Sequence, residues 1–538
     1  MDEAYSGVAF SAMSQRVALE AAELSAGTIK AFAALRARST ESTVGPVAPV
    51  VPTDKPAFRS ATSSGTRPSA GPTYRLTLLL GVALGACSRG EARSDLERRA
   101  APSSVASVVP TPPAPASSAK PDDDSSDIVP PSRDASSCPR EEAAALTELE
   151  TEIPRASPRA GAERGAIADL AAFAWDFYGQ AAVGNRNFVY SPYSIAVASA
   201  MLSAAAGGKT LAEIQNALRF SHTGAKLHQA HNALSSVLSS RNHPSATQRS
   251  VQLLRVSNHL WVDSSARPTP AFLDTLAQHY GSAAHVVEFA EHADEVRRAI
   301  NHRVCRDTRA LIPELLAKGA VDSDTRMVLT SALYLKALWK KQFAKEKTEP
   351  RSFSTLSGDV VDVPTMHGQR EGRYAAGKGY VVASLPYSGA ELEMVFLVPD
   401  KGNFPSFVRS LGATRVAATT AGLRPKLLEI ALPRFKIQSN LPLEQALARA
   451  GMKAAFSRAA EFPLLGGQVY VAKAVHEARL ILDEEGTEAA AATAYGTKFL
   501  SSGPEVTPVV VKIDRPFVFF IRDQSGAVLF VGHVLDPR

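Results

Sequence analysis

Several side chains in this sequence have types that could carry out catalysis, but their spacing departs from the motifs that catalysis requires. Residues 208–210 (Gly-Lys-Thr) end like a phosphate-binding loop, yet Ser203 stands where the first glycine of that motif must be, and a helix rather than a strand is predicted before them. His476 and Glu477 begin like the zinc-binding helix of a metalloprotease, but Leu480 occupies the position of the second histidine. Neither segment predicts a catalytic site.

Two further histidines are candidate metal ligands by residue type. His228 and His231 lie three residues apart in a polar stretch that offers no further ligands, so we expect a solvent-exposed helix face there. The sequence contains no G-x-S-x-G nucleophile motif and no recognisable cofactor motif. Because no nucleophile, base or metal set comes together, we expect a protein that is not an enzyme and uses no cofactor.

The most informative stretch joins a predicted strand, residues 479–482, to an acidic bend marked by Gly486 and then to a run of small side chains, residues 487–493. Alanine favours helices, so an Ala-rich helix is one interpretation of this run. The run is short, however, lacks an apolar stripe and has threonine at both ends. Small side chains also suit a segment that must enter a close-packed sheet. The residues by themselves leave both interpretations open.

The chain that must position this segment has 538 residues and an ordinary globular composition. Hydrophobic residues make up 45% and charged residues 21%, which allows a sizeable core. The 59 basic and 53 acidic side chains leave a formal charge of +6, too small an excess to indicate nucleic-acid binding. Three cysteines are too few for a disulfide scaffold or a cysteine-rich metal cluster. No apolar run reaches the roughly 18 residues of a membrane-spanning helix, so we do not expect an integral membrane protein.

The N-terminal third differs in composition from the rest. Residues 1–75 mix Ala, Ser, Thr and Pro with little apolar periodicity, and we expect a poorly ordered region or a wrongly assigned start. Residues 76–87 form a short apolar stretch behind a basic residue and end in Leu-Gly-Ala-Cys, which resembles a bacterial lipobox. This predicts a lipoprotein-type signal with Cys87 as the lipidated residue. A short buried helix with a core cysteine is the alternative.

Residues 88–160 are rich in Pro, Ser, Ala and charge, and they cannot bury enough apolar surface to offset the entropy of ordering them. We expect a disordered tether. Cys138 lies in this tether and Cys305 in a helical stretch; the two could pair or stay free, and a free, buried Cys305 is the expected state. Signal, tether and following domain predict an extracellular or cell-surface lipoprotein that is anchored to a membrane.

Residues 161–538 contain no comparable linker and predict one large domain. Helical spacing of apolar residues is found at residues 167–178, and a second helix is predicted from Ser191, as N-cap before Pro192, to Met201. A third begins at Lys209. Later segments have strand patterns, at residues 395–398, 428–432 and 509–513, and in a closing hairpin of residues 517–521 and 528–531. Helices early and strands late predict an α+β fold.

Several separated motifs, taken in order, resemble the serpin family of serine protease inhibitors. They are residues 187–195 (NFVYSPYSI), 329–339 (LTSALYLKALW), 385–387 (LPY), 432–435 (LPRF), 451–452 (GM), 476–478 (HEA) and 515–519 (RPFVF). The resemblance covers roughly residues 166–537. It implies a serpin fold, with a helical N-terminal half, a large central mixed β-sheet, smaller sheets and an exposed reactive-centre loop.

The resemblance also implies a mechanism, that of a monomeric, one-use inhibitor. A serine protease cleaves the exposed loop and forms an acyl-enzyme, and the cleaved loop then inserts as a new strand into the central sheet and deforms the protease. The hinge of that loop would be Glu484, Glu485, Gly486, Thr487, Glu488, Ala489, Ala490, Ala491, Ala492 and Thr493. Side chains alternate in an inserted strand, so Thr487 and Thr493 would share one face, turned to the core.

The family's spacing from Gly486 puts the reactive bond at Leu500-Ser501. Leucine before the bond suits an apolar primary pocket, which predicts covalent partners of the chymotrypsin-like class. A slip of register to Phe499 would keep this specificity, whereas a slip to Lys498 would imply trypsin-like targets. The main alternative is a non-inhibitory serpin that serves as a surface-anchored binding or chaperone-like protein.

In the family, a polar cluster beneath the sheet helps to control its opening. The matching positions are Ser191, Ser194, His476 and Ser331, the last where the family usually has asparagine. Because serine is shorter than asparagine, we expect a bridging water or looser packing there. Other departures from the family pattern are Arg303 in place of a tryptophan, Ala310-Leu311 in place of a Gly-Lys pair, and Ala337 in place of a glycine.

Overall fold

The computed structural model describes residues 138, 146–182, 184–242, 252–487 and 507–538. The chain divides into two units, Met1–Pro115 and Ala116–Arg538, and all described residues belong to the second. The predictions for residues 1–75, for the signal at 76–87 and for Cys87 therefore lie outside the described residues.

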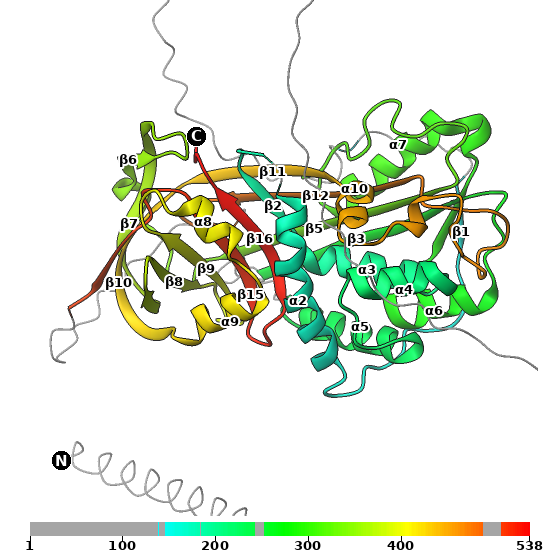
Figure 1. The fold of residues 1–538 in the computed structure, drawn as a ribbon, viewed down its shortest axis with the longest axis horizontal. Coiled ribbons are helices and arrows are strands. Elements are labelled where there is room, and N and C mark those ends of the chain that lie inside the picture. The colour runs from blue at the N-terminus through cyan, green and yellow to red at the C-terminus, as the bar shows by residue number, and fades with distance from the viewer. Residues whose placement is uncertain (1–137, 139–145, 183, 243–251, 488–506) are drawn as a thin grey trace, which may run out of the picture. The chain divides into compact units, whose positions relative to one another are not determined.

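A seven-stranded mixed sheet, the central sheet, forms the middle of the second unit (Figure 1). Its strands, in spatial order, are β1 (Leu146–Leu149), β4 (Ala284–Val287), β3 (Gln252–Asp263), β5 (Met327–Leu338), β13 (Gly486–Thr487), β12 (Lys473–Leu482) and β11 (Phe435–Pro442). The strands β5 and β12 are parallel and pair directly from Val328 opposite Lys473 to Leu333 opposite Ala478. Beyond these residues they separate, and β13 lies between them.

A second, nine-stranded sheet holds most of the C-terminal chain. In spatial order its strands are β14 (Val509–Lys512), β10 (Arg424–Pro433), β7 (Val360–Gly377), β8 (Tyr380–Pro386), β9 (Leu392–Pro399), β15 (Phe517–Asp523), β16 (Val528–Val534) and β2 (Phe188–Tyr190), and β6 (Glu349–Ser354) pairs with β7. The predicted strands near residues 395, 430 and 510 and the closing hairpin are confirmed as β9, β10, β14 and β15–β16.

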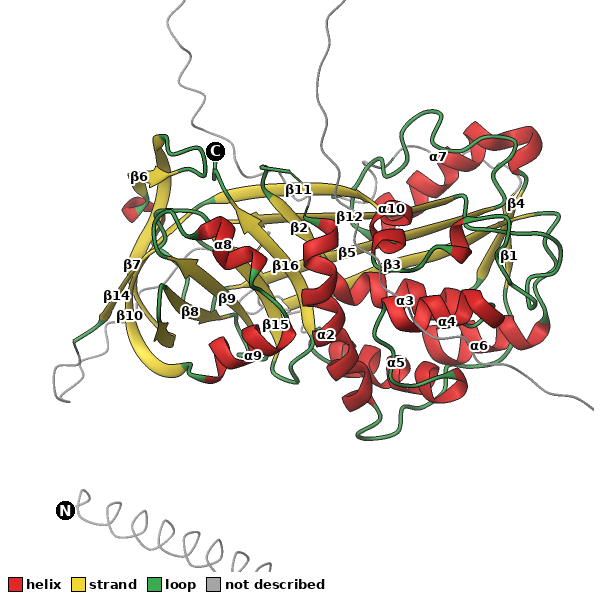
Figure 2. Ribbon diagram, viewed as in Figure 1, coloured by secondary structure: helices red, strands yellow, loops and turns green. Residues whose placement is uncertain are grey.

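Helices cover both faces of the central sheet (Figure 2). On one side lie α2 (Glu163–Ala181), α3 (Pro192–Ser203), α4 (Gly208–Ala217), α5 (Gly224–Ser239) and α6 (Pro270–Tyr280), and on the other lies α7 (Phe289–Asp307). The short helices α8 (Phe404–Arg409), α9 (Ala413–Ala421) and α10 (Leu443–Arg449) and the 3₁₀ turns η2 (Lys345–Lys347) and η3 (Ala454–Phe456) complete the set. Among the described residues, no helix combines the length and the apolar character needed to cross a membrane.

The alternation of side chains along the central strands builds two separate cores. Leu260 of β3 and Leu329 of β5 face the large core shared with α3, whereas their neighbours Trp261 and Val328 face a smaller core beneath α7. This period of two is what a sheet buried on both faces requires. The serpin-type α+β architecture is thus present in the described residues.

Helix α3 begins as the sequence predicts. The Ser191 side chain accepts a hydrogen bond from the Ser194 backbone N–H at 3.1 Å, and Pro192 occupies the first helical position. All twelve residues of α3 are buried, because the helix lies between the two sheets. It therefore places Ser191 and Ser194 against the central sheet.

The tether prediction is wrong for its last residues. Strand β1 lies inside residues 88–160 and pairs with β4 from Leu146 opposite Val287 to Leu149 opposite Ala284. Further along, Arg155 Nε donates to Asn232 Oδ1 at 2.8 Å. The backbone hydrogen bonds gained at a sheet edge order a segment whose composition alone would leave it disordered.

Two side-chain predictions are also wrong. Cys305 is not free, because it forms a disulfide with Cys138. His228 and His231 do not lie on a solvated helix face, since α5 packs between α2 and α6 and both imidazoles are buried. Their burial lowers the pKa of His228 to about 4 and that of His231 to about 3.

Candidate functional site

The candidate site is the seam between β5 and β12, which is closed at one end and occupied by β13 at the other. In β13, Gly486 pairs with Leu338 and Thr487 with Ala337, both antiparallel to β5. Thr487 also pairs with Leu482 at the end of β12. Gly486 and Thr487, the first residue of the small-residue run, are therefore already part of the central sheet.

A tight acidic turn brings the chain from β12 into β13. Asp483 Oδ1 accepts hydrogen bonds from the backbone N–H groups of Glu485 at 2.9 Å and Gly486 at 3.2 Å. The turn requires glycine at position 486, where φ is +153° and a Cβ would lie 2.1 Å from the Ala337 carbonyl oxygen. Any other residue would push the hinge out of the sheet.

Aromatic side chains fix the hinge from one side. The hydroxyls of Thr487 and Tyr387 lie 2.6 Å apart and are buried. The Tyr387 ring stacks on Trp339 with centroids 4.6 Å apart, and Trp339 Nε1 donates to the Asp483 carbonyl at 3.0 Å. Burial raises the pKa of Tyr387, so its hydroxyl keeps its proton for this contact. In the intact chain the Thr487 side chain is therefore buried beside Tyr387.

The three acidic residues of the turn are all buried and differ in their partners. Lys345 Nζ lies 2.8 Å from Glu485 Oε1, and this contact raises the lysine's pKa. Glu484 Oε1 accepts a hydrogen bond from the Thr348 hydroxyl at 2.6 Å. Among the described residues, no basic side chain forms an ion pair with Asp483. Burial, with the nearby charges of Glu485 and Glu484, raises its pKa to about 6 although two backbone N–H groups oppose the shift.

At the closed end of the seam, the four residues of the predicted polar cluster come together. His476 of β12 lies opposite Ser331 of β5 in the sheet, and His476 Nε2 accepts a hydrogen bond from the Ser191 N–H at 2.9 Å. The Ser194 and Ser331 hydroxyls lie 2.9 Å apart. The cluster therefore joins α3 to both strands of the seam.

The protonation of His476 follows from its partners. Because Nε2 accepts from a backbone N–H, Nδ1 carries the proton, and it lies 3.1 Å from the Ser331 carbonyl and 3.2 Å from its hydroxyl. Burial lowers the pKa of His476 to about 3, so the ring is neutral at physiological pH. A neutral imidazole contacts both sides of the seam without placing a charge inside the sheet.

Sequence reasoning missed Asn258 of β3. It lies opposite Ser331 in the sheet, its Oδ1 accepts from the Ser194 hydroxyl at 2.8 Å, and its Nδ2 donates to the Ser194 carbonyl at 2.9 Å. Ser331 contacts Ser194 and His476 directly, and Ser194 in turn contacts Asn258. The signal in the sequence is an amide within a strand-like run, but only the β3–β5 register shows that it meets Ser331.

The remaining predicted site residues lie outside the described residues. These are Glu488, Ala489, Ala490, Ala491, Ala492 and Thr493 of the hinge and the reactive bond Leu500-Ser501. The described part of the site ends at Thr487.

The described residues thus combine a mixed central sheet, a short strand β13 between β5 and β12, and a buried polar cluster that joins the sheet to α3. The profile of the family described as Serpin (serine protease inhibitor) matches residues 168–537. The chain belongs to the serpin family.

Individual relatives agree with this assignment. An uncharacterised serpin-like protein of Thermococcus kodakarensis is 30% identical over 381 residues, which cover 70% of this chain and 87% of that protein. The leukocyte elastase inhibitor of Homo sapiens is 32% identical over 368 residues, covering 65% of this chain and 93% of the inhibitor. The crystal structure of the thermophilic serpin tengpin in its native state matches in fold, with a TM-score of 0.65 and 24% identity, over 73% of this chain and 100% of that chain.

Proposed function

We propose that this protein inhibits chymotrypsin-like serine proteases as a suicide substrate, by taking its own cleaved loop into the central sheet. The observation that carries the proposal is the position of β13, which already lies between β5 and β12 where these strands have separated. The residues after Thr487 would extend β13 along the seam, antiparallel to β5. The cleaved loop would then enter the sheet as the continuation of an existing strand.

The β13 register predicts which contacts insertion must break. Continued from Gly486 opposite Leu338, it brings Thr493 opposite Ser331, the residue that now contacts His476 across the closed seam. Insertion to Thr493 thus replaces the Ser331–His476 contact by contacts to a small side chain with its own hydroxyl. On the face that Thr493 would share with Thr487, the residues between them are Ala489 and Ala491, which are small and add no bulk that would have to be forced between the strands.

The proposed reactive bond is Leu500-Ser501. Residues 484–500 span roughly 55 Å when extended, which is enough to carry an attached protease from one end of the seam toward the other. An acyl-enzyme at Leu500 would be dragged along as the loop inserts. Cleavage at Phe499 would select the same proteases, and cleavage at Lys498 would select trypsin-like ones.

Incubation with chymotrypsin followed by denaturing electrophoresis tests the proposal. We expect an adduct that survives denaturant, and we expect the variant Leu500→Arg to form it with trypsin instead. Cleavage of the loop without any adduct, for every protease tried, would support the non-inhibitory alternative. An unchanged preference in Leu500→Arg would show that the bond lies elsewhere in the loop.

We also propose that the protein is a monomeric bacterial lipoprotein, anchored outside the cell through Cys87 and the residues that follow it. The lipobox-like sequence before Cys87 supports this location. Metabolic labelling with radioactive palmitate would incorporate label into the natural chain and none into Cys87→Ser. Equal labelling of both would contradict the anchor.

A further inference from the structure

Helix α7 and the segment that follows it cross the seam into which the loop would insert. We call residues 308–325 the strap. One hydrophobic cluster contains Val304 of α7, Leu315 of the strap, Val328 and Ala332 of β5 and Val475 of β12, so it bridges both strands of the seam. Separating β5 from β12 must disturb this cluster.

Hydrogen bonds hold the strap on the far side of the seam. Arg479 of β12 donates to the Leu311 carbonyl at 2.9 Å, and Asn440 of β11 donates to the Leu315 carbonyl at 3.3 Å. On the near side, Asn301 of α7 accepts from the Leu315 and Leu316 N–H groups at 3.0 and 2.8 Å. Because these hydrogen bonds join the strap to α7, β11 and β12, the seam opens only if α7 shifts or if the hydrogen bonds from the strap to β11 and β12 break.

A disulfide fastens the last turn of α7 to the N-terminal segment. Cys305 of α7 is bonded to Cys138, 167 residues earlier in the chain. Strand β1, which follows Cys138, pairs with β4 at the outer edge of the sheet, on the β5 side of the seam. Both Cys138 and β1 precede residue 168, where the family match begins.

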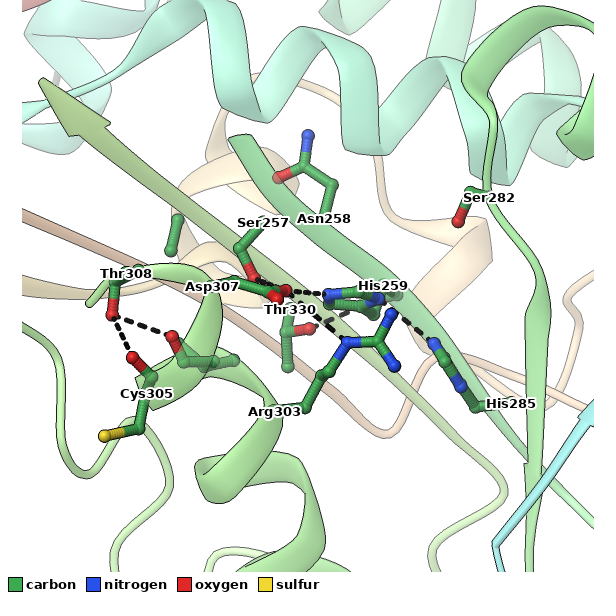
Figure 3. Close-up of polar contacts among 12 residues, drawn as sticks. Ser257, Asn258, His259, Ser282, His285, Arg303, Cys305, Asp307, Thr308 and Thr330 are labelled. Carbon is green, nitrogen blue, oxygen red and sulfur yellow. Dashed lines mark hydrogen bonds and ion pairs between the residues drawn. The ribbon is translucent and has the colours of Figure 1, made fainter. Parts of the chain in front are cut away.

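A network of ion pairs also holds the C-terminal end of α7. Arg303 Nη1 lies 2.6 Å from Glu148 Oε1 of β1, and Arg303 Nε lies 3.6 Å from Asp307 Oδ2. Figure 3 shows Arg303 and Asp307 pointing from α7 toward His259 of β3, whose Nε2 lies 2.7 Å from Asp307 Oδ2, while the sulfur of Cys305 points away from it. The disulfide and the ion pair therefore hold α7 from two sides.

We propose that the Cys138–Cys305 disulfide is a redox-sensitive clamp on the insertion seam. In the oxidised protein it holds α7 and the strap over β5 and β12 and slows the entry of a strand; in the reduced protein α7 shifts more readily and a strand enters faster. This regulation rests on the loop-insertion function proposed above. It acts on the opening of the seam and leaves the reactive bond unchanged.

A dithiol such as dithiothreitol supplies the reduction. One of its thiolates attacks one sulfur of the protein disulfide and releases the other cysteine as a thiolate. Its second thiol then attacks the mixed disulfide, closes a cyclic disulfide and releases the second cysteine. The dithiol thus loses two electrons and two protons, and the two protein cysteines gain them.

A synthetic peptide with the sequence of residues 486–500 measures the opening of the seam without any protease. The intact, full-length protein is incubated with excess peptide, with and without dithiothreitol, and the rate of peptide incorporation is followed by native electrophoresis and mass spectrometry. We expect incorporation to be about tenfold faster in the reduced protein, the change produced by a modest lowering of the opening barrier. The variant Cys138→Ala should be as fast as the reduced protein and should not respond to dithiothreitol.

Three further variants separate the clamp from a general loss of stability. Glu148→Gln weakens the second fastening and should speed incorporation about threefold with the disulfide intact. Glu150→Gln makes the same charge change at an exposed residue just past β1 and should leave the rate unchanged. Val382→Ala removes buried volume from β8 of the other sheet, so it lowers stability away from the seam and should not speed incorporation.

The outcomes distinguish the two proposals. Equal incorporation rates in the oxidised and reduced protein, or an equal acceleration by Val382→Ala, would overturn the clamp and leave the insertion mechanism standing. No peptide incorporation in either redox state would instead overturn strand insertion itself, and the clamp with it. A rate of peptide incorporation that rises both on reduction and in the variant Cys138→Ala supports both the clamp and the insertion mechanism.

Discussion

The two ends of the seam between β5 and β12 are stabilised by different kinds of contact. At one end the strands have parted, and Gly486 and Thr487 fill the gap through backbone pairing, an acidic turn and a buried hydroxyl pair. At the other end the strands pair directly, and neutral polar side chains join them to α3. The proposed insertion would therefore start from the occupied end, where a strand is already in place, and its barrier would lie at the closed end.

The largest effect on this difference between the two ends is expected when a charge is placed at the occupied end. In Thr487→Arg the side chain would enter the buried space beside Tyr387, where a lone charge costs roughly 3–5 kcal/mol. We expect the variant to be cleaved as a substrate and to form no stable adduct with chymotrypsin, whereas Thr487→Ser should behave like the natural chain. Undiminished adduct formation by Thr487→Arg, scored by denaturing electrophoresis, would contradict insertion through this end.

The acidic turn predicts a pH dependence at the occupied end. The pKa of Asp483, about 6 in the folded protein, lies above its ordinary value of 3.8, so the folded state holds a proton that the unfolded state has lost. The stability from this group is fully present below pH 3.8 and is lost as the pH rises through 6. Ionised Asp483 then costs the fold about 3 kcal/mol.

Asp483→Asn removes this titration and keeps the oxygen that accepts the two backbone hydrogen bonds. We expect the variant to exceed the natural chain in its free energy of unfolding by about 2–3 kcal/mol at pH 7.5 and by little at pH 4. Urea denaturation at the two pH values measures this, with Glu346→Gln, an exposed residue of η2, as the control. A difference that is the same at both pH values would refute the assigned titration.

A smaller effect is expected from the closed end. Ser194→Ala removes the hydroxyl that donates to Asn258 and contacts Ser331, leaving buried polar atoms without this partner at a cost of about 2 kcal/mol. The matched control is Ser203→Ala in the same helix, because the Ser203 hydroxyl donates only to the local Ala200 carbonyl. Equal losses of unfolding free energy in Ser194→Ala and Ser203→Ala would show that the polar cluster does not stabilise the closed end of the seam.

The smallest effect is predicted for the strap. Ala310 has a φ of +59°, a left-handed conformation that glycine adopts without strain and that costs an alanine about 1 kcal/mol. Ala310→Gly should therefore raise the free energy of unfolding by that amount, whereas Ala277→Gly in the middle of α6 should lower it by about 1 kcal/mol. A loss of stability in both variants would mean that the Ala310 backbone is not strained.

The sequence predicted the parts of this site that depend on local chemistry. Ser191 and Pro192 have the pattern of a helix start, and Gly486 marks a bend that only glycine fits, so both features could be placed without a structure. The partners Asn258 and Tyr387 could not, because their roles depend on strand register and on contacts between distant segments.

The same reason explains the two errors near the N-terminus. The four residues of β1 lie in a Pro- and Ser-rich stretch and form a strand only because the edge of β4 offers them hydrogen bonds. Likewise, Cys138 and Cys305 meet across 167 residues, a pairing that nothing in their local sequences indicates. Composition predicts the conformation of a segment in isolation, whereas the conformation of β1 depends on the hydrogen bonds offered by the edge of β4.

The most direct test of the account compares the thermal unfolding of the intact protein with that of protein cut in the loop by thermolysin, a metalloprotease that forms no acyl-enzyme. If the cut loop extends β13 along the seam, the nicked protein should melt at least about 10 °C above the intact protein, which for a domain of this size corresponds to roughly 8 kcal/mol. Equal melting temperatures, with the cut confirmed by mass spectrometry, would show that the seam takes up no further strand.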